Sequence, residues 1–410
     1  MRRRAGWLPE DQDGLEAWLT GHRERVEARG AEVVLHPVIA EFAELIDTDP
    51  VLRMTFDRMI TQVPTGRAYR KRHVTSVEQL LRLVNEVLTM APEFSEDSMV
   101  ITPIAAILDW ASATPAGFAA FRDPRVNAML KKVLTAWCAF LSSCDSCYVL
   151  NDSPSGWKGA AARRAIGIEA YQHDPDDEHW GFTSWNDFFT RRFVDGARPV
   201  AAPDDDAVIV SACESTPYGI SRDVRRQDRF WIKTQPYSLQ DMLAGDPAVE
   251  EFVGGTVYQA YLSATNYHRW HSPVAGTIVR AFVEDGTYYS EADSEGSDAV
   301  EPQTSQSYLA HVATRAIIIV QADNAAIGLM AFVAVGMVEV SSCVIDPDVT
   351  PGHHVEKGGS LGHFQFGGST HCLVFRAGVI ADFAFQAIPQ PHDPHPPLVQ
   401  VRSKLATAVS

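Results

Sequence analysis

The chain has 410 residues, of which 46% are hydrophobic and 21% are charged; 35 Lys and Arg against 52 Asp and Glu give a net charge of −17. This length exceeds the size at which one hydrophobic core usually stops growing, so we expect two domains. The negative charge argues against nucleic acid or an anionic membrane as a partner, because both carry repelling phosphates. There is no run of apolar residues long enough to span a bilayer, and the basic start of the chain is not followed by an apolar segment. We therefore expect a cytoplasmic protein.

Residues 1–155 are predicted to form a helical N-terminal domain. Asp123 and Pro124 are typical of a helix start, and Thr75 with Glu78 matches a capping box. Four stretches place apolar residues at helical spacing, which is typical of packed core faces rather than a cofactor pocket. These stretches comprise Leu15, Trp18, Leu19 and Val26; Val38, Phe42, Leu45 and Ile46; Leu80, Leu81, Val84, Val87 and Leu88; and Val126, Met129, Leu130, Val133, Leu134 and Trp137.

Residues 156–410 are predicted to form a compact β-rich catalytic domain, so the expected fold class is α+β. A connection rich in Gly, Pro and Asp at 151–177 leads to a short helix at 185–193. Beyond it the pattern changes to short, mostly β-branched segments separated by turns. Strands are predicted at 208–211, 255–262, 276–283, 316–320, 327–340, 371–375 and 379–385.

The cysteines and acidic stretches do not indicate a metal site. Among the six cysteines, only Cys144 and Cys147 form a CxxC pair, and no second pair completes a zinc site. Cysteines without such partners are typical of small packing residues. The acidic stretches at 203–206 and 291–301 indicate solvated turns, and the proline-rich segment with two histidines at 389–397 indicates a linker. We expect no metal.

A Gly-Gly-Ser-Thr segment, Gly367–Thr370, lies between two stretches of alternating character and is predicted to be a turn. Its two glycines allow backbone conformations that other residues resist, and such strain is typical of functional turns. Ser369 is therefore a candidate for self-cleavage. Cys372 is a weaker alternative as the nucleophile.

Two histidines and a carboxylate lie upstream of this serine. His268 and His271 belong to the run TNYHRWHSPVAG, and Glu214 belongs to the run VSACES. In an extended segment, residues 268 and 271 would face opposite sides, so both reach one pocket only if the chain bends, for instance before Pro273. Together with Ser369, these residues supply a hydroxyl, an imidazole and a carboxylate.

The order of these elements and their flanking words resembles the phosphatidylserine decarboxylase family of pyruvoyl enzymes. The resemblance begins at WNDFFTRRFVDGARPV and includes VSACES, IKTQPYSL, YLSATNYHRWHSPVAGTI, VAVGMVEVSS and the GGST segment. This sequence departs from the family at Glu214, where the family has Asp, and at Thr234, where it often has Gly. Within the family, Tyr148–Trp157, Gly286–Gly296 and Ser305–Val320 resemble a subgroup of soluble tryptophan decarboxylases.

The resemblance implies a self-made cofactor. Decarboxylation needs an electron sink that ordinary side chains do not offer. By resemblance, Ser369 attacks the carbonyl of Gly368, and the chain is cut between them into a β chain and an α chain that starts with a pyruvoyl group. His271, polarised by Glu214, is expected to be the base for this processing, and His268 is expected to deliver a proton during turnover.

The resemblance also predicts the substrate, a free aromatic L-amino acid, with L-tryptophan first. The nearest alternative is phosphatidylserine decarboxylase itself, which shares the chemistry but acts on a lipid. A serine hydrolase is less favoured because GGST lacks the G-x-S-x-G nucleophile elbow. A non-catalytic scaffold is also less favoured because all three chemical groups are present.

Overall fold

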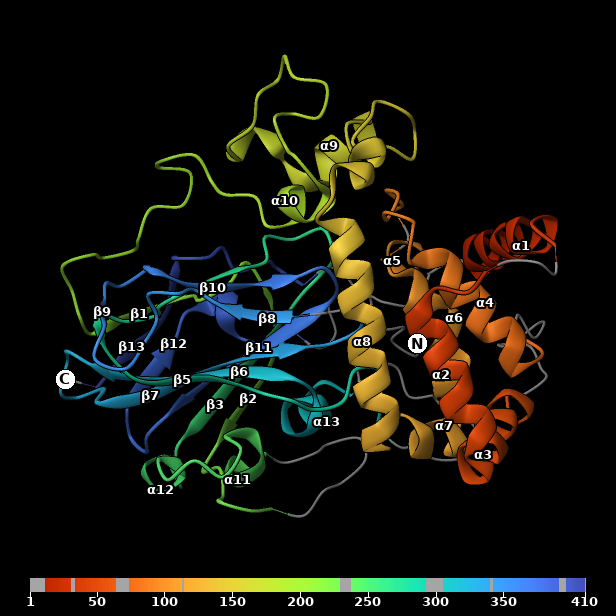
Figure 1. The fold of residues 1–410 in the computed structure, drawn as a ribbon. Helices are drawn as coiled ribbons and strands as arrows, with labels where there is room; N and C mark the ends of the chain where they lie inside the picture. The colour runs from red at the N-terminus through yellow and green to blue at the C-terminus, as the bar shows by residue number, and fades with distance from the viewer. Residues whose placement is uncertain are drawn as a thin grey trace. The chain divides into compact units, whose positions relative to one another are not determined.

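The computed structural model describes residues 12–30, 34–63, 74–96, 98–112, 114–228, 237–292, 305–339, 342–390 and 396–409. The chain divides into two compact units (Figure 1). One unit combines residues up to 166 with 173–188 and 287–305, and the other combines 167–172, 189–286 and 306–410. A helical region followed by a β-rich region confirms the predicted α+β class.

The first unit is built mainly from helices, and its longest helix begins where the sequence predicts. Asp123 caps this helix, α8, by accepting a hydrogen bond from the Arg125 backbone N–H at 2.8 Å, and Pro124 occupies the first turn. All six apolar residues predicted for its inner face are buried. The helices are α1 Gln12–Ala28, α2 Pro37–Thr48, α3 Pro50–Thr61, α4 Val77–Val87, α5 Ser98–Ile101, α6 Pro103–Ser112, α7 Pro115–Ala120, α8 Pro124–Leu141, η1 Cys144–Val149, α9 Ala160–Ile166 and α10 Trp185–Phe189.

The capping box of α4 differs from the prediction by one residue. Ser76, not Thr75, is the N-cap, and its hydroxyl accepts a hydrogen bond from the Gln79 backbone N–H at 3.1 Å. The Gln79 side chain in turn accepts from the Thr75 backbone N–H at 2.9 Å. The prediction with Glu78 was wrong because adjacent Thr and Ser both match a capping pattern, and only the backbone geometry separates them.

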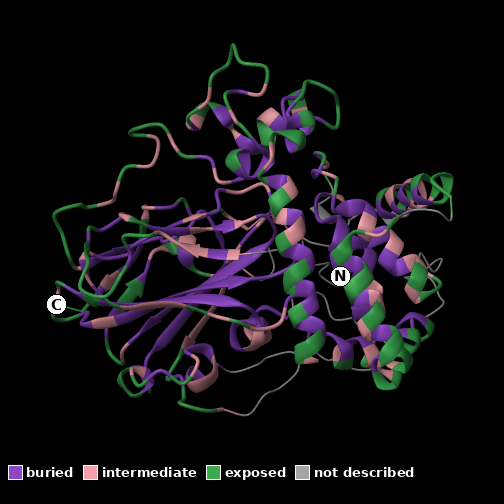
Figure 2. Cartoon of the chain, in the orientation of Figure 1, coloured by how far each residue is buried: buried purple, intermediate pink, exposed green. Residues whose placement is uncertain are grey.

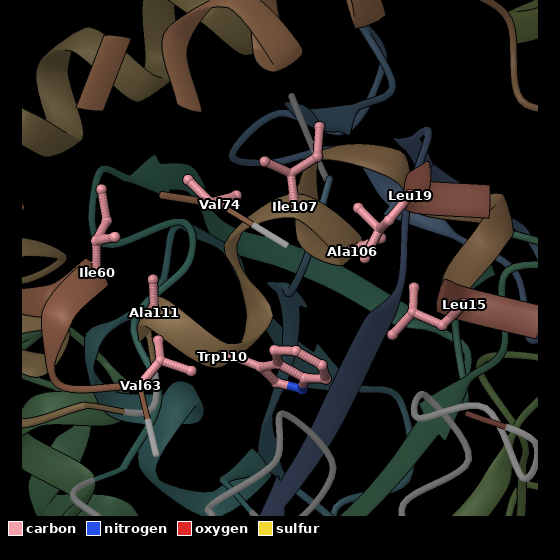
Figure 3. Close-up of a pocket in the computed structure, with 9 residues that line it drawn as sticks. All are labelled: Leu15, Leu19, Ile60, Val63, Val74, Ala106, Ile107, Trp110 and Ala111. Atoms are coloured by element: carbon pink, nitrogen blue, oxygen red, sulfur yellow. The ribbon is translucent and has the colours of Figure 1, made fainter. Parts of the chain in front are cut away.

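A small apolar cavity lies within the first unit (Figure 3). Leu15 and Leu19 of α1, Ile60 of α3, and Ile107 and Trp110 of α6 are among its lining residues. Its lining contains none of the candidate catalytic residues. The cavity is therefore a feature of helix packing rather than of the candidate site.

The second unit contains three antiparallel sheets. The seven-stranded sheet has the order β2-β3-β11-β7-β6-β5-β9, and the two three-stranded sheets have the orders β1-β13-β12 and β4-β10-β8. The strands are β1 Val208–Val210, β2 Thr216–Arg222, β3 Thr256–Leu262, β4 Arg269–His271, β5 Gly276–Glu284, β6 Arg315–Ala322, β7 Leu329–Gly336, β8 Ser342–Ile345, β9 His354–Val355, β10 Ser360–Gln365, β11 Ser369–Phe375, β12 Ile380–Phe383 and β13 Lys404–Ala408. The short helices are η2 Ile168–Ala170, α11 Leu239–Met242, α12 Val249–Phe252, α13 Gln306–Val312 and η3 Phe385–Ala387.

The core of the second unit surrounds β11, which is buried along its whole length (Figure 2). Leu373 of β11 lies between Tyr258 of β3 and Phe332 of β7. Phe332 packs against Trp270 of β4, with ring centroids 5.7 Å apart. The small sheet that contains β4 therefore packs on this face of the large sheet.

Three predicted elements have different ends in the structure. The helix predicted at 185–193 ends at Phe189, and the strand predicted at 327–340 ends at Gly336. Ser369 and Thr370 were predicted in a turn but form the first two residues of β11. Parts of the sequence segments 232–239 and 291–301, including Thr234, lie outside the described residues, as do His392 and His395.

The described residues show no metal cluster and no membrane-spanning helix. No group of three or more His, Cys, Asp or Glu in this part of the chain could hold a metal ion. No described helix is long and apolar enough to cross a bilayer. All six cysteines are free thiols, of which Cys144 is exposed.

Candidate active site

Ser369 begins β11, between Leu262 of β3 and Gly336 of β7. The residue is fully buried, and its hydroxyl oxygen has no hydrogen-bond partner in the described part of the chain. Buried polar atoms without partners are rare in folded proteins, so each needs an explanation. A hydroxyl that is not held by a neighbour is free to approach the peptide bond before it.

The peptide before Ser369 is fixed on both sides. The backbone N–H of Met337 donates to the Gly368 carbonyl oxygen at 3.1 Å, and the Gly368 N–H donates to the Val338 oxygen at 3.0 Å. Gly367 has a φ of 138°, which favours glycine. An N–H aimed at a carbonyl oxygen polarises the carbonyl and stabilises negative charge that develops there. The Met337 N–H is thus placed to polarise the carbonyl of the bond that the sequence predicts to be cut.

His271 is buried at the end of β4, and both of its ring nitrogens have partners. Nδ1 lies 3.0 Å from the Gly358 carbonyl oxygen, and Nε2 lies 2.9 Å from the Tyr267 hydroxyl. The Gly358 carbonyl only accepts, whereas Nη2 of Arg402, 3.2 Å from the same Nδ1, only donates. The carbonyl contact is the shorter one, so we assign the proton to Nδ1, and Tyr267 then donates to Nε2. Burial, and then the nearby Arg402 guanidinium, lower the pKa of His271 to about 3. The imidazole is therefore neutral.

His268 precedes β4 and has a free lone pair. Its Nδ1 lies 3.0 Å from the Asn266 carbonyl oxygen, so Nδ1 carries the proton. Nε2 is buried and has no hydrogen-bond partner among the described residues. The ring stacks on Phe189, with centroids 4.3 Å apart, and Phe189 contacts Phe366, two residues before Gly368. Burial lowers the pKa of His268 to about 3. Nε2 is thus an unoccupied proton acceptor.

Glu214 is buried and paired with Arg198. The guanidinium Nη2 and Nε donate to the carboxylate at 2.6 Å and 3.1 Å, and the Val401 backbone N–H donates to its second oxygen at 2.8 Å. This pairing raises the pKa of Arg198. Arg402, the next residue after Val401, places Nη2 3.2 Å from Nδ1 of His271. Glu214 and His271 thus share neighbouring residues, but no hydrogen bond joins them among the described residues.

The structure links these residues through the path of the backbone. β4 pairs with β10, and the Phe364 N–H of β10 donates to the His268 carbonyl at 3.0 Å. β10 ends at Gln365, and the chain then passes through Gly367 into β11. In the described part of the chain, Ser369 makes no hydrogen bond to His268 or His271. Their roles in catalysis stay predictions.

Several residues of the site were missed in the sequence. Arg198 and Tyr267 lie within the words that carry the family resemblance, so a signal for them was present. Phe189 also lies in such a word, but its contact with His268 depends on tertiary packing. Met337 acts through its backbone N–H, for which a side chain gives no signal.

Two alternatives to the serine chemistry are weakened by the structure. Burial raises the pKa of Cys372, so the thiol stays protonated and is a poor nucleophile. Ser369 begins a strand, whereas a nucleophile elbow places its serine at a turn from a strand into a helix. Neither a cysteine enzyme nor an α/β-hydrolase fits this site.

Comparison with known sequences identifies the class. Two family profiles match the chain, both described as phosphatidylserine decarboxylase, one over residues 36–166 and one over residues 185–392. The chain belongs to the phosphatidylserine decarboxylase family and is a pyruvoyl-dependent decarboxylase.

Individual relatives are similar over most of the chain. Decarboxylase iboD of Amanita muscaria is 38% identical over 339 residues, which cover 78% of this chain and 91% of the relative. The L-tryptophan decarboxylase of Psilocybe cubensis is 33% identical over 401 residues, covering 91% of this chain and 88% of the relative. That of Psilocybe cyanescens is 34% identical with the same coverage. These similarities support the predicted resemblance to tryptophan decarboxylases.

Proposed function

We propose that this chain cuts itself between Gly368 and Ser369 and then decarboxylates a free aromatic L-amino acid, with L-tryptophan giving tryptamine and carbon dioxide. One observation carries the proposal. The unpartnered hydroxyl of Ser369 follows a carbonyl that is polarised by the Met337 N–H. This arrangement supports attack of the side chain on its own preceding peptide.

Processing would proceed in three balanced steps. The Ser369 oxygen bonds to the Gly368 carbonyl carbon, and the peptide C–N bond breaks, leaving an ester and a free amine on residue 369. Loss of the residue 369 α-proton and of the Cβ–O bond releases Gly368 as a carboxylate and leaves dehydroalanine. Water then replaces the nitrogen, which leaves as ammonia, and a pyruvoyl group remains at the start of the α chain.

The proposed base for the first step is His271, oriented by Glu214. Serine is a weak nucleophile at neutral pH and needs a neighbouring base. For His271 to act as the base, the hydrogen bond between its Nε2 and the Tyr267 hydroxyl must break. Glu214 must also orient His271, although its carboxylate is paired with Arg198. His268 is proposed for turnover: its Nε2, unprotonated at neutral pH because burial lowers the pKa to about 3, would first take up a proton and then pass it to the substrate carbon.

The ketone at residue 369, once formed, supplies the electron sink for decarboxylation. Because the start of β11 is fully buried, bulk water would be kept away from the ketone carbon of residue 369. Strand pairing supports a stable two-chain product, because β11 is hydrogen-bonded to β3 on one side and β7 on the other. The α and β chains are therefore expected to stay together after cleavage.

The amino-acid substrate is supported by similarity to the Psilocybe enzymes, which extends through both units. The net charge of −17 also opposes residence on an anionic bilayer. Phosphatidylserine remains the competing substrate because the family profile carries that description. Cytoplasmic location stays a prediction from the sequence.

The test combines cleavage with an assay of substrates. Purified protein should give two fragments on a denaturing gel, and Ser369→Ala should remain one chain. Carbon dioxide release should be faster with tryptophan than with alanine. The expected ratio is about 30 to 150-fold if burial of the aromatic ring in the pocket determines the difference in binding. Cleavage of Ser369→Ala at the same bond would refute the serine assignment. Equal turnover of alanine and tryptophan, or activity confined to phosphatidylserine vesicles, would refute the substrate.

A further inference from the structure

A buried polar network covers the face of β11 opposite to that of Ser369. Its centre is Gln259 of β3, whose amide nitrogen donates to the Thr370 hydroxyl at 3.2 Å and to the Gln306 carbonyl at 3.0 Å. The amide oxygen of Gln259 accepts from the Tyr237 hydroxyl at 2.5 Å. Thr370 in turn donates to the Ala260 carbonyl at 3.0 Å. Gln259 is thus satisfied at both ends of its amide and is held in one orientation.

Gln306 belongs to this network through its backbone, but its side chain has no partner. It begins α13, which packs against β11 and β7. The residue is 0% exposed, and neither its amide nitrogen nor its amide oxygen has a hydrogen-bond partner among the residues that the structure describes. A fully buried amide without any partner is rare in folded proteins and indicates a ligand or a water molecule.

The position of Gln306 relates it to the reaction. Gln259 bridges the Gln306 backbone to Thr370, the residue directly after Ser369. The Ser307 side chain, one residue along α13, hydrogen-bonds Tyr218 of β2, so the start of the helix is anchored on two strands. These contacts place the start of α13 on the Thr370 face of β11, opposite to the Ser369 side chain, so a substrate joined to residue 369 would reach the amide around the free end of the cleaved strand.

We propose that Gln306 is a substrate-binding residue whose amide N–H groups hold the carboxylate of the amino acid. This inference rests on the proposed function. A carboxylate only accepts hydrogen bonds, and an amide nitrogen offers two donors. A neutral donor also suits a carboxylate that is about to leave as uncharged carbon dioxide, because it stabilises the ground-state anion less than a guanidinium does.

The experiment compares the substrate with its product, which lacks the carboxylate. In Gln306→Leu, the KM for tryptophan should rise on the order of 10 to 100-fold, as expected for loss of hydrogen bonds to a charged group. The inhibition constant of tryptamine should stay within about twofold, because the amine makes no such contact. Gln321→Leu, which changes an exposed glutamine on β6, is the matched control and should alter neither constant.

A denaturing gel must first show that the Gln306 variant is cleaved. If it is not, Gln306→Glu has the same shape and should raise the KM through repulsion of the substrate carboxylate without weakening tryptamine. Unchanged constants, or equal loss of affinity for tryptophan and tryptamine, would overturn the carboxylate contact. Failure of the wild-type chain to cut itself or to release carbon dioxide would instead refute the proposed function.

Discussion

The two histidines of the site differ in the availability of their lone pairs. Tyr267 occupies Nε2 of His271, while Nε2 of His268 is free. Both imidazoles are neutral because burial lowers each pKa to about 3. At the residue scale, this difference is the basis for proposing a role in processing for His271 and a role in turnover for His268.

We predict that His268→Ala is cleaved normally but turns over slowly. Loss of a positioned proton donor reduces kcat by about 100 to 10,000-fold. Gel analysis should show two chains, and carbon dioxide release should report the slow turnover. His353→Ala, at an exposed position, is the control. A normal kcat for His268→Ala would exclude this imidazole from proton transfer.

The Glu214 carboxylate has two possible tasks, and a double variant separates them. Glu214→Gln should slow cleavage, but it also leaves the half-buried Arg198 without its carboxylate partner, which by itself is destabilising. Glu214→Gln with Arg198→Met removes that stray charge. If the carboxylate acts on His271, cleavage measured over time on gels stays slow in the double variant, as it should in His271→Ala. Recovery to the wild-type rate would show that Glu214 serves only to neutralise Arg198.

At the scale of elements, β10 positions the histidine-bearing strand. Gly362 of β10 faces Trp270 of β4 and has a φ of 154°; a Cβ there would lie 2.2 Å from the Val344 carbonyl oxygen and 2.7 Å from the Trp270 ring. Neither the backbone nor a packed indole can move aside cheaply. The close approach of three strands therefore depends on this glycine.

Gly362→Ala is expected to destabilise the protein by about 2 to 3 kcal/mol or more, from overpacking. The control is Gly378→Ala, where φ is 74° but nothing lies near a Cβ, so only a backbone cost of about 1 to 2 kcal/mol is expected. Urea unfolding measures both. Equal destabilisation by the two variants would show that the packing around Gly362 is not the constraint.

At the scale of the whole molecule, buried histidines couple stability to pH. Among the described residues of the second unit, burial lowers the pKa of His268, His271 and His371 to about 3, and that of His311 and the half-buried His363 to about 4. Below the ordinary histidine pKa of 6.5, the unfolded chain binds protons that the folded chain does not. Stability is therefore full above pH 6.5 and is lost as pH falls toward 4.

We expect the free energy of unfolding to fall by about 1.4 kcal/mol per pH unit for each such histidine in this window. Urea titrations of Ser369→Ala, which is expected to remain one chain, should show full stability at pH 7.5 and the loss below pH 6.5. Adding His371→Leu should flatten the dependence by one proton, because this imidazole is fully buried and burial is the main cause of its lowered pKa. His353→Leu is the exposed control. An unchanged slope with His371→Leu would contradict the assignment.

Local patterns in the sequence determined the class and much of the architecture. The capped apolar stripe predicted α8, and β-branched segments predicted β3, β5 and β6, because each depends on residues close together in the chain. The sequence motifs around Ser369, His271 and Glu214 indicated the family, which the comparisons confirm. The short strands β2, β4 and β10 were missed because three to seven residues with mixed polarity carry little periodic signal.

Only the tertiary structure decided which atoms meet. The Met337 N–H reaches Gly368 across the sheet, Arg198 takes the carboxylate of Glu214, and Gln259 contacts Thr370 over a separation of 111 residues. Such partners depend on strand order and register, which local spacing does not encode. For the same reason the free amide of Gln306 could not be recognised from its neighbours in the chain. The sequence by itself thus determined which chemical groups are present, and the fold decided which of them are occupied and which remain free to act.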